Sequence, residues 1–141
     1  MPDTAAACLR CQDEAGADVT VLLYLLWRAA DGWLLDGTSI AAADAAVSEW
    51  RTEVVQPLRA VRRALKPTSE AALRSQVAAA ELAAERIALA RLAALPVGDA
   101  AARAAPRVAA RTHLAAYGAL PTGAVATLLT AFAAQQEPRH G

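Results

Sequence analysis

The chain has 141 residues, and its 14 basic and 14 acidic side chains give a formal net charge of zero. This balance argues against binding to nucleic acid or anionic membranes through overall basicity. Hydrophobic residues make up 56% of the chain, but forty of them are alanine, the strongest helix former. Because no run of β-branched residues alternates with polar ones, the composition predicts an all-α protein. We expect a compact bundle of five to six helices in a single domain over residues 1–135, with a disordered tail at 136–141.

The first two helices are predicted at residues 3–14 and 19–30. Asp3 or Thr4 is placed to cap the first helix, and Gly16 to end it. Asp18 is placed to cap the second, which is apolar on most of its circumference and should therefore be the central helix of the bundle. Its longest apolar run, Val19 to Trp27, is shorter than the roughly 20 residues that span a bilayer.

Apolar residues recur every three or four positions from 39 to 66, which predicts a long amphipathic helix. Pro57 lies inside this pattern and cannot donate a hydrogen bond to residue 53, so the helix should kink or divide there. A fourth helix is predicted to open at Thr68 or Ser69. Its expected buried line consists of Leu73, Val77, Ala80, Ala84, Ile87 and Leu92.

Two further helices are predicted at 106–117, where Pro106 fits a first turn, and from Thr122 to about residue 135. The segment from Thr112 to Gln136 lacks charged residues. Gly118 and Pro121 interrupt it, however, so we predict no membrane span. The first ten residues combine neither a basic stretch nor an apolar one, which favours a cytoplasmic protein.

Two segments carry a resemblance to a known family. The first is Cys8 to Val19 with the Leu22–Trp27 run that follows, and the second contains Trp50–Arg59 and Arg62–Lys66. Over residues 7–66 the chain resembles a domain-of-unknown-function family of small helical proteins from proteobacteria. The resemblance implies an α-helical cytoplasmic protein and no particular activity. A leucine is usual in the family at the position of Cys11.

The sequence offers little for metal, cofactor or catalytic chemistry. Cys8 and Cys11 form a C-x2-C pair without a second cysteine pair, and we expect both in the core. Glu81 and Glu85 lack the accompanying Glu-x-x-His of a carboxylate metal site, so they should belong to a charged outer face. His113 has no neighbouring carboxylate to orient it as a general base. We therefore predict no metal and no cofactor, and the sequence favours a non-enzymatic protein over an enzyme without deciding between them.

Four basic residues form the first candidate binding surface. Arg59, Arg62, Arg63 and Lys66 fall within two helical turns, which suits a phosphate group, an acidic protein or membrane headgroups. The alternative is a solvated face or intramolecular ion pairs, since basic residues near a helix C-terminus are common without any ligand. The cluster lacks interleaved aromatic residues, which argues against nucleic acid.

The second candidate surface is the turn around Gly16, where Gln12, Asp13 and Asp18 lie close in sequence. The alternative is local, with Gln12 and Asp13 bonding turn amides and Asp18 capping the next helix. Taken together, these features favour a non-enzymatic protein that binds another macromolecule, and we expect that macromolecule to be a protein. The rival hypothesis is a small-molecule binding protein or enzyme, whose cleft would be lined by Gln12, Asp13, Tyr24, Trp27 and Trp50.

Overall fold

The computed structural model describes residues 2–98 and 101–137, with side chains from Thr4 onward. It is an all-α protein, as the composition predicted. Its residues group into two units, Met1–Ala43 with Pro96–Gly141, and Asp44–Leu95. The prediction of one domain over residues 1–135 stays a prediction. No described helix is both long enough and apolar enough to cross a membrane.

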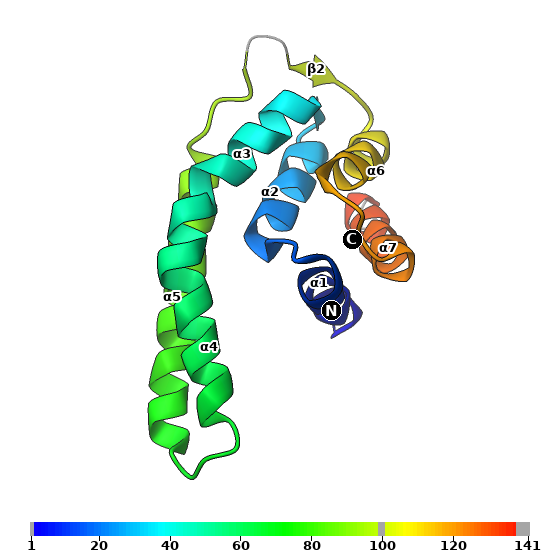
Figure 1. Ribbon diagram of the computed structural model, residues 1–141. Coiled ribbons are helices and arrows are strands. Elements are labelled where there is room, and N and C mark those ends of the chain that lie inside the picture. Colours follow the sequence, from blue (N-terminus) through cyan, green and yellow to red (C-terminus); the bar gives the residue numbers. More distant parts are fainter. Residues whose placement is uncertain (1, 99–100, 138–141) are drawn as a thin grey trace. The chain divides into compact units, whose positions relative to one another are not determined.

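Seven α-helices, one π-helical segment and two very short strands make up the described chain (Figure 1). The elements are α1 (Pro2–Ala15), α2 (Val19–Ala30), β1 (Trp33–Leu34), α3 (Gly37–Trp50), η1 (Arg51–Val55), α4 (Gln56–Leu65), α5 (Ala71–Ala93), β2 (Ala102–Arg103), α6 (Pro106–Tyr117) and α7 (Thr122–Gln136). Since α3, η1 and α4 follow one another without a break, the described residues hold six helical segments, in agreement with the predicted five to six.

In the first unit, α2 is the central helix, as predicted, because it packs against α1, α6 and β1. The helix α7 packs in turn against α1 and α6. One apolar cluster joins Cys8 and Cys11 of α1 to Leu22 of α2, Leu114 of α6 and Leu128 of α7. A second cluster joins the alanines of α2 and α6 to Phe132. Small residues let these helices approach closely, so alanine serves here as core.

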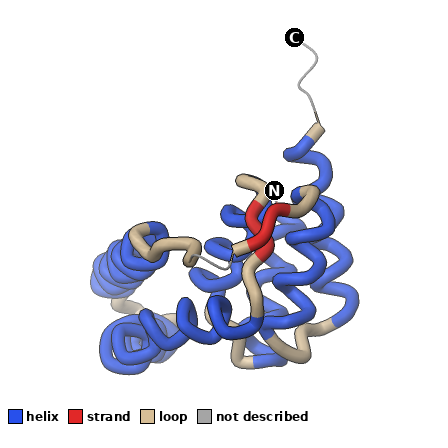
Figure 2. The backbone as a smooth tube through the Cα atoms, turned by 90° about the horizontal axis from the view of Figure 1, so that it is seen from above, coloured by secondary structure: helices blue, strands red, loops and turns tan. Residues whose placement is uncertain are grey.

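A buried histidine ties the first unit together across long stretches of sequence. The Leu35 amide donates to His113 Nε2 over 2.9 Å, and Nδ1 lies 2.9 Å from the Leu25 carbonyl. The ring is therefore the neutral Nδ1–H tautomer, which accepts at one nitrogen and donates at the other. Beside it, β1 and β2 form the small antiparallel pair drawn red in Figure 2, with Trp33 opposite Arg103. The sequence did not predict this pair.

The second unit is an antiparallel helical hairpin of the end of α3, η1 and α4 packed against α5. Pro57 stands in the first turn of α4, and the turn before it widens into the π-helix, where the Gln56 amide bonds the Arg51 carbonyl. A proline inside a helix leaves the carbonyl four residues earlier without its usual donor and crowds it. The wider turn accommodates that defect. The helix therefore does not divide at Pro57, and the irregularity takes the form of a π-helical segment in an otherwise continuous helix.

Candidate functional site

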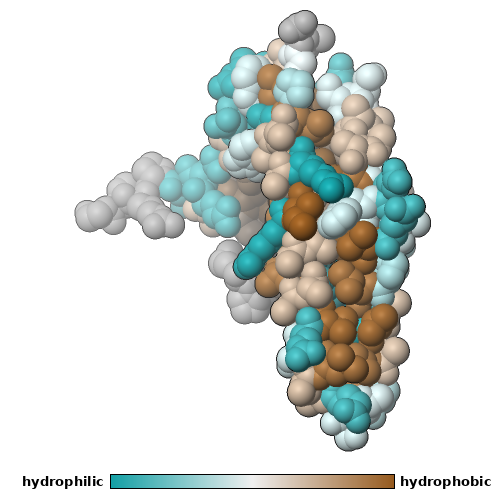
Figure 3. Space-filling view, turned by 90° about the vertical axis from the view of Figure 1, so that its left-hand side faces the viewer, coloured by the Kyte–Doolittle hydropathy of each residue, from teal (hydrophilic) through white to brown (hydrophobic). Residues whose placement is uncertain are grey.

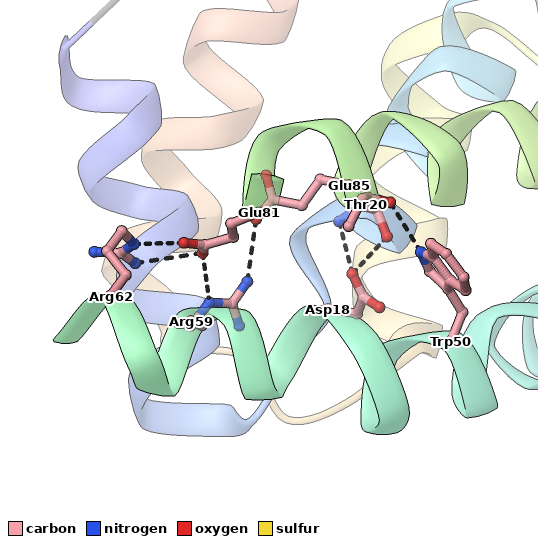
Figure 4. A network of polar contacts seen from close by, with 8 residues as sticks. Asp18, Thr20, Trp50, Arg59, Arg62, Glu81 and Glu85 are labelled. Atoms are coloured by element: carbon pink, nitrogen blue, oxygen red, sulfur yellow. Dashed lines mark hydrogen bonds and ion pairs between the residues drawn. The ribbon is translucent and has the colours of Figure 1, made fainter. Parts of the chain in front are cut away.

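The basic residues of α4 meet two carboxylates of α5 inside the hairpin (Figure 4). Arg59 Nε donates to Glu81 Oε1 over 3.2 Å, and its Nη2 donates to Glu85 Oε1 over 3.2 Å. Arg62 reaches Glu81 through both Nε and Nη2. Glu81 is buried, with 6% of its surface exposed. The predicted outer face around Glu81 is therefore wrong, because α5 turns this residue toward the arginines of α4.

The electrostatics of this cluster favour the ionised carboxylate. Burial by itself would raise the pKa of Glu81, but the hydrogen bonds from Arg62 and Arg59 outweigh it and lower that pKa. The pKa of Arg62 is raised by the same bond to Glu81. Arg59 and Arg62 are thus bonded within the hairpin, and the side chains of Arg63 and Lys66 are exposed.

Trp50 is the second anchor of the hairpin. Its indole Nε1 donates to the Ala84 carbonyl over 2.9 Å, and the Arg91 guanidinium lies 4.4 Å from the ring centroid. A donor bonded at one end and a cation stacked on the ring hold this side chain in one orientation. Trp50 therefore fixes the register of α5 against the α3–η1–α4 helix.

One side of the hairpin carries two rows of apolar residues. The α4 row consists of Val54 in η1 with Leu58, Val61 and Leu65 of α4, and the α5 row is Leu73, Val77, Ala80, Ala84 and Ile87. Each row follows helical spacing, and the bond from Trp50, one turn before Val54, to Ala84 places both rows on the same side. We call these nine residues the hairpin face.

The hairpin face is partly open to solvent. Ala84 is buried, and Val54, Leu58, Leu65 and Val77 are half-buried. Val61 and Leu73 are each 47% exposed and Ile87 is 43% exposed. The predicted buried line of the fourth helix is therefore wrong at Leu73, Ala80 and Ile87, which are exposed. Its periodicity correctly identifies one side of α5, but a two-helix hairpin covers only the seam between its helices. Brown apolar residues gather along the hairpin in Figure 3.

The junction between α1 and α2 is built for local capping. Asp18 Oδ1 accepts hydrogen bonds from the amide and the hydroxyl of Thr20, at 2.8 and 2.6 Å, and thereby caps α2 as predicted. Its own amide donates to the Tyr117 hydroxyl over 3.2 Å. Gln12 is half-buried and Asp13 is exposed on α1. Asp18 is therefore committed to the start of α2, and any binding role of Gln12 and Asp13 stays a prediction.

An apolar groove of about 290 Å³ lies among α1, α2 and α7. It is lined by Thr4, Leu23, Leu26, Trp27, Ala30, Leu128, Ala131, Phe132 and Gln135. Of the five side chains predicted to line a cleft, Trp27 lines this groove. Tyr24 is buried, and its hydroxyl accepts a bond of 3.3 Å from Arg28 Nε. Arg28 also stacks on Trp27, 4.5 Å from the ring centroid, so Trp27 is held as one wall.

The residues considered for metal or redox chemistry belong to the core. Cys8 and Cys11 are free and buried, and burial raises the pKa of both thiols, which disfavours the reactive thiolate. His113 is fully buried with both ring nitrogens bonded inside the first unit. Among the described residues, no three His, Cys, Asp or Glu side chains are grouped as metal ligands.

Comparison with known protein families identifies the family of this chain. Residues 1–92 match the family described as Protein of unknown function (DUF2390). The chain belongs to this family. The match includes the two segments on which the resemblance rested and also most of α5. No curated protein and no solved structure matches the chain significantly.

The sequence missed two features of these surfaces. The groove beside Trp27 combines residues from three helices that are distant in sequence, so no local motif announces it. The pairing of α4 with Glu81 and Glu85 had a signal, since α4 is basic and α5 carries two glutamates one turn apart. Charge alone did not indicate that the carboxylates face α4.

Proposed function

We propose that this protein is non-enzymatic and acts by binding another protein molecule, with the hairpin face as its contact surface. The observation that supports this is the composition of that face. Its nine residues are all apolar, and none is charged. Contiguous exposed apolar surfaces on soluble proteins mark interaction sites more often than isolated apolar residues do. Such a surface is better suited to a protein partner than to a polyanion.

The distribution of charge supports the same choice of surface. The cations of α4 lie on the other side of its apolar row, where Arg59 meets Glu85. Near the hairpin face, Arg91 is stacked on Trp50. A surface with charge at its edges and apolar residues at its centre has the organisation of a protein–protein interface. The basic residues then serve mainly to hold the hairpin in shape.

Site-specific photo-crosslinking in the producing cell tests this function. A benzoylphenylalanine is placed at Val61, in the hairpin face, or at Leu82, which is exposed to the same 47% but lies on the Glu85 side of α5. We expect protein adducts from position 61 and far fewer from position 82. Equal adducts from both positions, or none from position 61, would contradict the proposal.

The second candidate function is binding of a small molecule in the groove beside Trp27. Its volume of about 290 Å³ and its mainly apolar lining support this alternative. Because Thr4 and Gln135 are the polar lining side chains and no charged residue lines the groove, the ligand class is uncharged and apolar. Calorimetric titration with 1-octanol tests it, and Leu23→Trp, which fills the groove, should abolish the heat. Equal heats for both proteins would refute it.

A further inference from the structure

The hairpin face has properties that specify its partner more closely than an apolar composition alone. The helix α4, which the structure describes in full, has no fully buried residue. Within the hairpin, Leu58 and Leu65 of its apolar row are only half-buried and Val61 is exposed. Helical hairpins reach a stable core when a second pair of helices covers this side, as in four-helix bundles. Whatever covers the face must supply two more helices or an equivalent apolar surface.

The shapes of the two rows are complementary to each other. Arg59 reaches both Glu81 and Glu85, and Trp50 reaches Ala84, so the middle of α4 lies level with Ala80 and Ala84. At that level α4 presents Leu58 and Val61, while α5 has the exposed Ala80 and the buried Ala84. The larger residues of the α5 row, Leu73, Val77 and Ile87, stand on either side of these two alanines. At the level of Ala80, therefore, the α4 row is bulky where the α5 row is small.

We propose that the hairpin face binds the same face of a second copy of this chain and forms an antiparallel four-helix bundle. A two-fold axis parallel to the helices places α4 of each copy over α5 of the other at the same level. The bulky middle of α4 then packs onto the level of the exposed Ala80 in the other copy's α5, twice by symmetry. The inference rests on the proposed function and names its partner.

The size of the face is sufficient for such a dimer. The α4 row, extended to Trp50, is about 24 Å long at a rise of about 1.5 Å per residue, and two packed helices are about 20 Å wide. The face therefore offers about 500 Å² on each copy, or about 1,000 Å² for the pair, which is the lower bound for a specific interface. The nine residues of the face carry no charge, and Arg91, at the Trp50 end, is stacked on the indole ring.

Light scattering after size exclusion tests this inference with two matched variants. We expect the unmodified chain at tens of micromolar to have about twice the mass of one 14.6 kDa chain. Val61→Glu should halve that mass, because it buries two carboxylates in the dimer. Leu82→Glu removes an equally exposed residue outside the face and should leave the dimer intact. Circular dichroism checks that both variants remain helical.

The outcomes separate this inference from the proposed function. A monomer for the unmodified chain, or a dimer that Val61→Glu leaves intact, overturns the inference. A monomer that still gives adducts with a different protein from position 61 in the cell supports the proposed function and assigns the face to that partner. If Val61→Glu also loses its helical signal, a second variant, Ala80→Leu, tests the inference. The larger side chain would occupy the space that α4 of the second copy fills at Ala80, so this variant should also be a monomer.

Discussion

At the scale of single residues, the protonation of His113 is coupled to the free energy of unfolding. Burial lowers its pKa below the ordinary 6.5, although the bond to the Leu25 carbonyl acts in the opposite direction. The folded protein therefore binds fewer protons at this position than the unfolded chain does. The free energy of unfolding should have its full value above pH 6.5 and should fall as the pH drops below 6.5. Urea denaturation from pH 8 to pH 5 measures this dependence.

Replacing His113 with alanine should remove that dependence and lower stability throughout. The variant leaves the Leu35 amide and the Leu25 carbonyl without their partners and opens a cavity between α2 and α6. We expect a loss of about 2–4 kcal/mol in the free energy of unfolding at pH 7.5. An alanine variant as stable as the parent protein would show that the ring does not bridge these elements.

The pair of Arg62 and Glu81 should show a measurable coupling. Each single change to glutamine removes the charged bond and leaves the other side chain inside the hairpin. A double-mutant cycle should give a coupling free energy of about 1–2 kcal/mol. Because the pKa of Glu81 is lowered, its contribution is present above about pH 4.5, the ordinary value for glutamate, and is lost as the pH falls below it. Coupling that is unchanged at pH 3 would refute this assignment.

At the scale of elements, the turn between α1 and α2 depends on a left-handed glycine. Gly16 has φ +63° with open space where a Cβ would be, so replacement meets no neighbour and costs backbone strain alone. Gly16→Ala should reduce stability by about 1 kcal/mol. Gly118 also faces open space but has extended backbone, with φ 163°, so Gly118→Ala should change stability by less than about 0.5 kcal/mol. Equal losses in urea denaturation would contradict this difference.

Helix boundaries were the most predictable part of the fold, because capping and breaking are local. The segments 19–30 and 106–117 begin and end as predicted, after the cap at Asp18 and at Pro106. The first helix begins at Pro2, earlier than the predicted cap at Asp3 or Thr4. The side chain of Asp3 lies outside the described residues. So does most of the predicted tail, although Gln136 ends α7.

What the sequence could not predict is which side of an element is covered. The spacing of Leu73, Val77 and Ile87 correctly places them on one side of α5, but periodicity does not say whether a third helix packs there. The same limit applies to Arg59 and Arg62, whose carboxylate partners lie about twenty residues away. Reversing these two charges would break the hairpin, and so would not test a contact surface.

At the scale of the whole molecule, a dimer should make thermal stability depend on protein concentration. Mass action favours the folded dimer as the concentration rises. The thermal midpoint of the unmodified chain should therefore increase by several degrees between about 1 and 100 µM, whereas that of Val61→Glu should stay constant. Differential scanning fluorimetry across this range measures both. A midpoint independent of concentration for the unmodified chain would mean that the hairpin unfolds as part of a monomer.

The most direct test of a covered hairpin face is the reactivity of a thiol placed in it. Val61→Cys and Leu82→Cys are compared because both positions are 47% exposed in the single chain. The native Cys8 and Cys11 are buried with a raised pKa and should react slowly. Maleimide labelling followed by intact mass should then be at least about tenfold slower at position 61 than at position 82. Equal rates would show that the hairpin face is open, which would contradict this account.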